Sequence, residues 1–257
     1  MLYGRFAITM SYHKKVNAVA VKMPNLSLDF LQKHGIIYIS LCIFTVKLQG
    51  GIFLSEKMDQ RQKKFYDILV NGGSKDNVIV YEMMKYIPDD FSGKILEIPA
   101  RRSKVVYNKL SKLKNADITC VDSDKEALAE AEKRFAEHKI ANAKTIVGNI
   151  DNKLEFEDDT FDIVLSINGF DTFSNKNRAI SQTLRVLKKG GMLIAGFYVE
   201  GNSKLTDWKV KHKLVSNGIL KPPFYTAVSV QTTFSEIYEI KHFHERGSMV
   251  YFCAVKK

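Results

Sequence analysis

Cysteine is scarce in this chain of 257 residues, and its three cysteines are scattered. Cys42, Cys120 and Cys253 form no C-x-x-C pair and have no spacing typical of a zinc site. This argues against a disulfide-stabilised scaffold, and we expect no metal ligands. Because buried, reduced thiols are typical of a reducing compartment, we expect a cytoplasmic protein.

The sequence also has no hydrophobic run long enough to span a membrane. The apolar run at residues 35–46 contains about a dozen residues, whereas a span needs about 20. It lies too far along the chain for a signal peptide and is not followed by small residues at a cleavage site. We therefore expect no membrane span.

No run of basic residues reaches five, although the formal net charge is +11. Residues 1–57 carry seven basic and two acidic residues, and residues 58–257 carry 32 and 26. The excess lysine is diffuse and interleaved with acids. Since a nucleic-acid surface needs a basic patch or stripe, the composition does not favour a nucleic-acid partner.

Residues 1–57 do not share the pattern of the rest, and we treat them as a poorly defined extension preceding a domain at residues 58–257. One interpretation is a β-rich or disordered segment. The other is that the segment is not native coding sequence, since Gln49-Gly50-Gly51 can be encoded by CAA-GGA-GGA, which contains a bacterial ribosome-binding signal. Leu54 and Met58 would then be the candidate starts.

From Met58 onward, short apolar runs alternate with helix-period segments. Strands are expected at residues 94–98, 117–121, 144–147, 161–167 and 192–199, followed by a hairpin of residues 237–244 and 249–255. Helices are expected at residues 60–70, 76–86, from 104, from 123, before 188–191, at 206–215 and at 227–234. This order predicts a doubly wound α/β fold with a seven-stranded, mostly parallel sheet and a C-terminal antiparallel hairpin.

Two carboxylates lie at or near the ends of the first two of these strands, Glu97 and Asp122. In a sheet of this kind a ligand binds above the carboxyl ends of the strands, and an acid that ends the second strand can accept both hydroxyls of a ribose. The alternative is that Asp122 only begins the following helix, where a negative charge is favourable to the helix dipole. Ser123 and Glu126 have the spacing of a capping box.

Several segments together resemble the class I S-adenosylmethionine-dependent methyltransferases, and most closely the ubiquinone/menaquinone-biosynthesis type (methyltransferase type 11). The resemblance covers about residues 60–257. The segments that carry it are Lys94-Ile-Leu-Glu-Ile98, Thr119-Cys-Val-Asp-Ser123, Gly148-Asn149 with Leu154-Glu-Phe156, Phe161-Asp-Ile-Val-Leu-Ser-Ile-Asn-Gly169 and Arg185-Val-Leu-Lys-Lys-Gly-Gly191.

The resemblance implies S-adenosylmethionine as cofactor and assigns roles residue by residue. Glu97 would order the loop at the methionine end, with Ala100, Arg101 and Ser103 beside the cofactor. Asp122 would hold the ribose. Ser123, Asn149 and Ile150 would border the adenine, and Ser166, Asn168 and Gly169 would line the floor beneath the methyl group.

The loop after Glu97 departs from the family, which has glycines where this chain has Arg101 and Ser103. Glycine lets the backbone lie against a ligand and adopt positive φ. Arg101 could point to solvent, could bind the cofactor's carboxylate, or could fill the site and leave a fold without methyl transfer. Asn149 replaces the usual aspartate and can still accept a hydrogen bond through its amide oxygen.

No residue stands out as a general acid or base, and methyl transfer can proceed by positioning alone. Asp171 and His212 are candidates for substrate contact, against the alternatives of a solvated loop acid and a surface histidine. Trp208, Phe224 and Tyr225 would either roof the acceptor pocket or pack in the core. We expect methyl transfer to a small molecule; the alternatives are an inactive binding or regulatory relative and an RNA methyltransferase.

Overall fold

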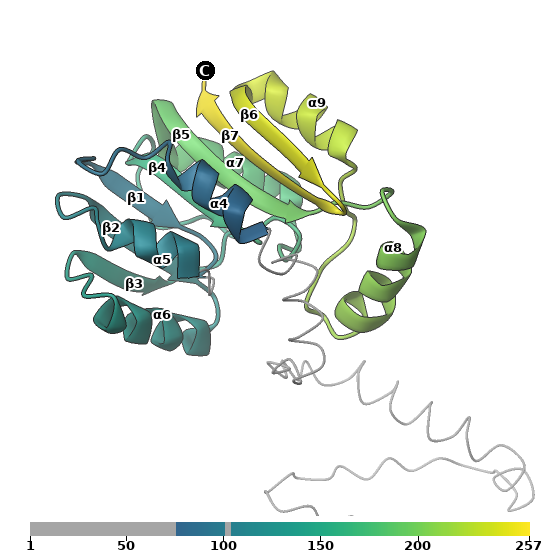
Figure 1. The fold of residues 1–257 in the computed structure, drawn as a ribbon, viewed down its shortest axis with the longest axis horizontal. Coiled ribbons are helices and arrows are strands. Elements are labelled where there is room, and N and C mark those ends of the chain that lie inside the picture. Colours follow the sequence, from purple (N-terminus) through teal and green to yellow (C-terminus); the bar gives the residue numbers. More distant parts are fainter. Residues whose placement is uncertain (1–75, 101–103) are drawn as a thin grey trace, which may run out of the picture. The chain divides into compact units, whose positions relative to one another are not determined.

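The computed structural model describes residues 76–100 and 104–257, which form a seven-stranded sheet with the strand order β3-β2-β1-β4-β5-β7-β6 (Figure 1). The strands are β1 (Lys94–Glu97), β2 (Asp117–Asp122), β3 (Ala143–Val147), β4 (Phe161–Ile167), β5 (Leu187–Tyr198), β6 (Tyr238–Arg246) and β7 (Met249–Lys256). The helices are α4 (Asp76–Met84), α5 (Lys104–Leu110), α6 (Lys125–Glu137), α7 (Lys176–Val186), α8 (Lys204–Val210), its π-helical continuation (Lys211–Val215) and α9 (Ala227–Ile237).

Strands β1 to β5 run parallel, whereas β7 is antiparallel to both β5 and β6. The strand order reverses between β1 and β4, so the chain leaves these two neighbours toward opposite sides of the sheet. The predicted doubly wound sheet with a C-terminal hairpin is confirmed. Such a reversal opens a crevice at the carboxyl ends of the two strands, where α/β proteins bind ligands.

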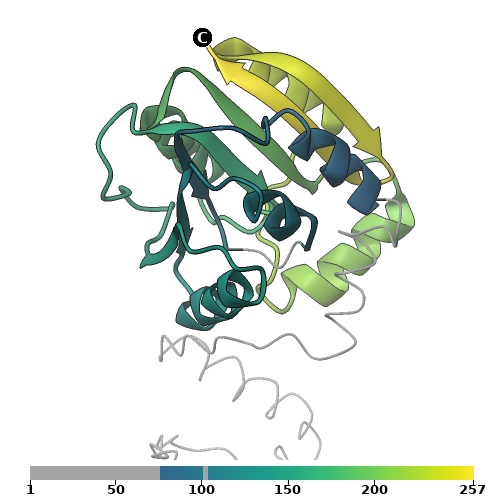
Figure 2. The same cartoon turned by 60° about the vertical axis from the view of Figure 1, so that its left-hand side comes forward.

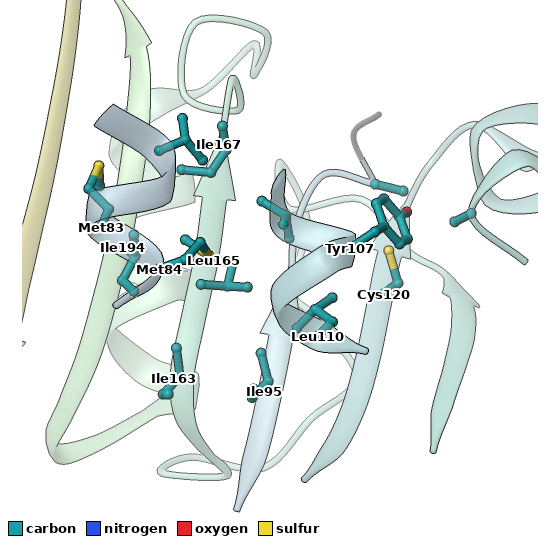
Figure 3. Close-up of a cluster of buried hydrophobic side chains, with 14 of the residues drawn as sticks. Met83, Met84, Ile95, Tyr107, Leu110, Cys120, Ile163, Leu165, Ile167 and Ile194 are labelled. Atoms are coloured by element: carbon teal, nitrogen blue, oxygen red, sulfur yellow. The ribbon is translucent and has the colours of Figure 1, made fainter. Parts of the chain in front are cut away.

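Helices cover both faces of the sheet (Figures 1 and 2). Successive residues of β4 point to opposite faces, so Leu165 joins the core under α4, α5 and α6, whereas Val164 joins the core under α7 and α9. Figure 3 shows the first of these cores, with Met84 of α4 and Leu110 of α5 lying over the central strands. The sheet is therefore shielded on both sides, which explains why its central strands are almost entirely apolar.

The second core is dominated by aromatic rings. Phe234 of α9 is fully buried and packs against Phe252 and Phe170, with ring centroids 4.8 and 5.5 Å apart. Phe197 of β5 joins the same group at 6.4 Å from Phe234. These rings fix α9 against β5 and β7 and so hold the hairpin onto the parallel part of the sheet.

Asp162 connects three strands at their amino-terminal ends, on the side of the sheet opposite the carboxyl ends of β1 and β4. Its carboxylate accepts hydrogen bonds from the backbone N–H of Lys94, at 2.8 Å, and from Nζ of Lys188, at 2.7 Å, and so joins β1, β4 and β5. A Cβ at Gly93 would lie 2.8 Å from that carboxylate, so a larger residue there would displace the Asp162 side chain. Partial burial by itself raises the pKa of Asp162, but the bonds from Lys188 and Lys94 outweigh it and hold that pKa below its usual value.

We expect Asp162→Asn to remove part of the acid sensitivity of the fold. A carboxyl with a lowered pKa in the folded state stabilises the protein fully above its unfolded pKa of about 4, and this stabilisation is lost as the pH falls from that value through the lower folded-state pKa. Denaturant midpoints measured from neutral to acid pH should therefore differ most at neutral pH and converge in acid. Glu155→Gln, at an exposed side chain, is the control; equal pH profiles for wild type and Asp162→Asn would contradict the assignment.

Three local predictions are wrong. Helix α7 ends at Val186, and residues 188–191 lie in β5, because Leu187 pairs directly with Phe161 before a register shift. Gly190, at φ +74°, is in the left-handed region inside this irregular stretch. Helix α6 is capped by Asp124, which accepts from the N–H of Glu126, so the capping box at Ser123 is not formed. The helix predicted at residues 206–215 is α-helical only from Lys204 to Val210 and then becomes a π-helix.

The helix predicted at residues 60–70, the proposed domain boundary at residue 57, and Arg101 and Ser103 lie outside the described residues. Within residues 76–100 and 104–257, no helix is both long and apolar enough to cross a bilayer. Cys120 and Cys253 are buried free thiols, as expected.

Candidate functional site

The predicted cofactor residues converge on one edge of the sheet because β1, β2 and β4 are parallel and end together there. Glu97 is the last residue of β1, Asp122 is the last residue of β2, and Asn168 follows the end of β4. The backbone N–H of Ile98 donates to Leu165, and that of Ala100 donates to Val121, at 2.9 and 3.1 Å. The chain leaving β1 is thus held between the ends of its two neighbouring strands.

Glu97 is buried beneath this edge. Its carboxylate accepts a hydrogen bond from the thiol of Cys120, with 3.3 Å between Sγ and Oε2. Burial, and then the negative charge of Glu97, raise the pKa of Cys120 far above its usual value, so the thiol keeps its proton and acts as a donor. The acid is therefore a fixed, inward-facing charge at the start of the loop that follows β1.

Asp122 is buried at the end of β2, and its Oδ1 accepts from the backbone N–H of Asp124 at 2.9 Å. The helix-capping role belongs to Asp124, two residues later, and not to Asp122. The contact of Asp122 is nevertheless with the N–H of the N-cap residue, so its position is compatible both with the ribose prediction and with the alternative of an acid at the helix start. Ser123, between them, is exposed, and its place beside the adenine stays a prediction.

The turn after β3 carries Asn149 and Ile150. Asn149 is exposed, and its Oδ1 accepts from the backbone N–H of Asp151 at 2.9 Å, so this oxygen already has one partner. Ile150 is buried in the second core. Asp151 accepts from the backbone N–H groups of Ser174 and Asn175, which attaches this turn to the start of α7.

At the end of β4, two side-chain oxygen atoms are buried without a hydrogen-bond partner among the described residues. They are Oγ of Ser166 and Oδ1 of Asn168. Asn168 has φ +59°, an uncommon conformation for a residue other than glycine. A buried polar atom without a hydrogen bond is costly, so each such atom in a native structure calls for an explanation.

Gly169 must be glycine because two loops meet at its Cα. A Cβ there would lie 2.3 Å from Oγ of Ser166 and 2.7 Å from Cδ of Pro99. The structure therefore places Ser166 under the backbone of Gly169, with Pro99 of the loop after β1 at its side. Whether these residues line the floor beneath a methyl group stays a prediction.

A scan of protein families matches residues 95–191 to the family described as "Methyltransferase domain". The chain is also similar to the demethylmenaquinone methyltransferase of Thermotoga maritima, with 31% identity over 117 residues, which is 46% of this chain and 48% of that protein. Residues 95–191 therefore match a methyltransferase domain. The chain's match spans about half the length of that curated relative.

Solved structures agree with the methyltransferase fold. An S-adenosylmethionine-dependent methyltransferase from Methanosarcina mazei superposes with a TM-score of 0.52 and 19% identity, covering 68% of this chain and 96% of that one. The cyclase SpnF superposes with a TM-score of 0.58 and 14% identity, covering 71% and 81%. Because one of these neighbours is described as a cyclase, the structural similarity shows the fold but does not determine a reaction.

Asp171, a candidate for substrate contact, is a buried residue of the matched segment. Its Oδ2 accepts from the backbone N–H of Tyr198 at 3.1 Å, and its carbonyl accepts from that of Lys221 at 2.8 Å. The alternative of a solvated loop acid is wrong. The carboxylate joins the turn after β4 to the end of β5, and the backbone carbonyl joins the same turn to the segment before α9.

His212, the other candidate, is exposed, with its ring centroid 4.8 Å from that of Trp208. Trp208 is itself 57% exposed, so it neither packs in the core nor covers an enclosed pocket. Phe224 and Tyr225 are partly buried and pack against the cores, next to Tyr198 and Phe197, with ring centroids 5.0 and 6.2 Å apart.

A buried lysine at the start of α7 was not anticipated from the sequence. Nζ of Lys176 donates to the carbonyls of Phe173 and Lys221 and lies 5.5 Å from the ring centroid of Phe224. Burial lowers its pKa, while the charge of Asp171 acts in the opposite direction. A lysine in a first helical turn gives no sequence signal of burial, because its carbonyl partners come from a distant loop.

Arg185, in the segment that carried the resemblance, holds the acidic loop between β3 and β4. Its guanidinium donates to the carbonyls of Phe156 and Leu154, at 2.6 and 2.9 Å, and to Asp158 at 2.9 Å. A hollow lies over this loop, lined by Lys153–Asp158 and Arg185. The arginine is thus a structural residue that fixes the loop following the Asn149 turn.

Proposed function

We propose that this chain transfers the methyl group of S-adenosylmethionine to a small-molecule acceptor. The observation that carries the proposal is the set of oxygen acceptors at the carboxyl ends of β1, β2 and β4. Glu97 and Asp122 supply buried carboxylates, and Asn168 supplies a buried oxygen without a partner among the described residues.

These residues fit the cofactor in chemical type. S-adenosylmethionine carries hydrogen-bond donors on its ribose, adenine and ammonium groups and a positive charge at sulfur, and oxygen acceptors are the complementary groups. When bound, it supplies an electrophilic methyl group. We assign the ribose to Asp122, the adenine border to Ser123, Asn149 and Ile150, and the ordering of the loop at the methionine end to Glu97.

Ala100 lies in the same loop, and we assign it, with Arg101 and Ser103, to the surroundings of the methionine end. Asn168 and Gly169, above Ser166, would face the methyl group and the acceptor. The protein's contribution is then to hold the two reactants in line and exclude water, since displacement at a sulfonium methyl group needs no proton transfer to reach its transition state.

Calorimetric titration of the purified chain with S-adenosylmethionine and S-adenosylhomocysteine tests the proposal. We expect heat with both ligands and tighter binding than with adenosine, which lacks the methionine tail. The absence of heat at millimolar concentrations of both ligands would contradict an enzyme and favour the alternative of an inactive relative. A gel shift with RNA that weakens as salt is added, and that competitor polyanions do not abolish, would favour the RNA alternative.

A further inference from the structure

Helix α8 and its π-helical continuation, residues 204–215, present an apolar stripe to the outside. Leu205 and Trp208 are 62% and 57% exposed, and His212 is exposed beside Trp208. Spacings of three and four residues place these side chains on one face of a helix. Trp208 is the only tryptophan of the chain, and apolar side chains that lie together on a surface, unlike single exposed ones, can mark an interaction site.

The opposite side of the same segment fixes it to the domain. Val210 and Leu214 are buried in the first core. Asp207 accepts from the hydroxyl of Tyr198 at 2.6 Å and from the backbone N–H of Gly201 at 3.1 Å. The outward stripe is therefore held by firm inward contacts, at the periphery of the sheet (Figures 1 and 2).

Lysines accompany the apolar stripe. Residues 201–221 contain five lysines and one acid, and that acid, Asp207, is turned inward by the contacts above. Lys204 and Lys211 are exposed and lie seven residues apart, so they follow the same flank of the helix, next to the stripe. The face thus combines an apolar centre with a positive border and no outward carboxylate within residues 204–215.

We propose that this face, the α8 face (Leu205, Trp208 and His212 with Lys204 and Lys211), docks the protein on an anionic membrane surface. Leu205 and Trp208 would enter the boundary between headgroups and acyl chains, where tryptophan is favoured, and the lysines would meet the lipid phosphates. The charge complementarity and the pairing of an aliphatic with an indole side chain carry the proposal.

A nucleic acid is the competing partner for a basic surface with an aromatic ring. Single-stranded nucleic acids bind in positively charged grooves that offer successive aromatic faces to the bases. The α8 face is a convex helix surface, and its most exposed large side chain, Leu205, has no face for stacking. The observations therefore favour the lipid surface.

The single tryptophan makes the test direct, because intrinsic tryptophan fluorescence of the full chain reports Trp208 alone. The probe is unilamellar vesicles of equal amounts of phosphatidylcholine and phosphatidylglycerol. We expect a blue shift of the emission and quenching by brominated acyl chains. Vesicles of phosphatidylcholine alone should give a much weaker response, and added salt should weaken the response to the anionic vesicles.

Variants with a matched control separate docking from nonspecific adhesion. Leu205→Glu and Val228→Glu each change the second residue of a helix, and Val228 is 71% exposed on α9. Leu205→Glu should weaken vesicle partitioning at least tenfold through lost apolar burial and added repulsion, and Val228→Glu should leave it within about twofold. Lys204→Ser with Lys211→Ser should weaken it roughly 30-fold, at about fivefold for each lysine near an anionic surface.

The proposal is overturned by an unshifted spectrum with anionic vesicles, or by equal partitioning of Leu205→Glu and Val228→Glu. Quenching by a single-stranded oligonucleotide without a response to vesicles would overturn it in favour of nucleic acid. Circular dichroism of each variant confirms that the fold is retained. The outcome is independent of the titration with S-adenosylmethionine, since docking requires no bound cofactor.

Discussion

Replacing Asp122 with asparagine is expected to weaken binding of S-adenosylmethionine by about 30- to 100-fold, which is about 2–3 kcal/mol. The change removes the charge that would accept the ribose hydroxyls. Asparagine keeps the shape of the side chain and can still accept from the backbone N–H of Asp124, and the cap that Asp124 places on α6 is unchanged. Calorimetry of the variant against the wild-type chain measures the effect directly.

The control lies at the other end of the same strand. Asp117 is the first residue of β2 and is exposed, so Asp117→Asn removes one negative charge at a distance from the proposed cofactor edge. We expect its affinity to stay within about twofold of wild type. Equal losses in the two variants would indicate an effect of net charge and would contradict the assignment of Asp122 to the ribose.

Truncation of Phe234 to alanine is expected to cost about 3–5 kcal/mol of unfolding free energy, the usual range for removing a fully buried aromatic ring. The ring lies between α9, β5 and β7 and touches Phe170, Phe197 and Phe252. Its loss would leave a cavity that rigid neighbouring rings fill only in part. Urea denaturation followed by far-UV circular dichroism gives the difference, provided that both proteins unfold in one transition.

Two further variants of α9 define the reason for that loss. Phe234→Leu keeps most of the buried volume and should cost clearly less than alanine. Val228→Ala, on the exposed side of the same helix, should change stability by less than about 0.5 kcal/mol. A loss below about 1 kcal/mol in Phe234→Ala would show that the aromatic core does not hold the hairpin in place.

Most of the architecture could be predicted because local patterns and tertiary contacts agree. Strand β4 was placed correctly from its apolar run, and both its faces are buried. The end of α7 was placed wrongly because Lys188, Lys189 and Gly190 have the composition of a helix C-terminus. The pairing that converts this stretch into strand, Leu187 with Phe161, joins residues distant in sequence and leaves no local signal.

Only those residues of the candidate site whose positions follow from the strand order could be predicted. Glu97 and Asp122 were found because an acid that ends a parallel strand has a fixed place at the sheet edge. The burial of Asp171 and Lys176 could not be predicted, because their partners are the backbone groups of Tyr198, Phe173 and Lys221. Every residue has a backbone carbonyl, and almost every residue has a backbone N–H, so the residue types in the sequence do not show which backbone group will be the partner.

Gly169 lies so close to Pro99 and Ser166 that the loop after β1 and the segment after β4 pack directly against each other. Neither loop can shift toward the other, since the space for even a methyl group is already taken. A larger residue at position 169 is thus tolerated only with a compensating change at Pro99 or Ser166. A side chain at position 169 would therefore disturb the loop after β1 as well as the segment after β4.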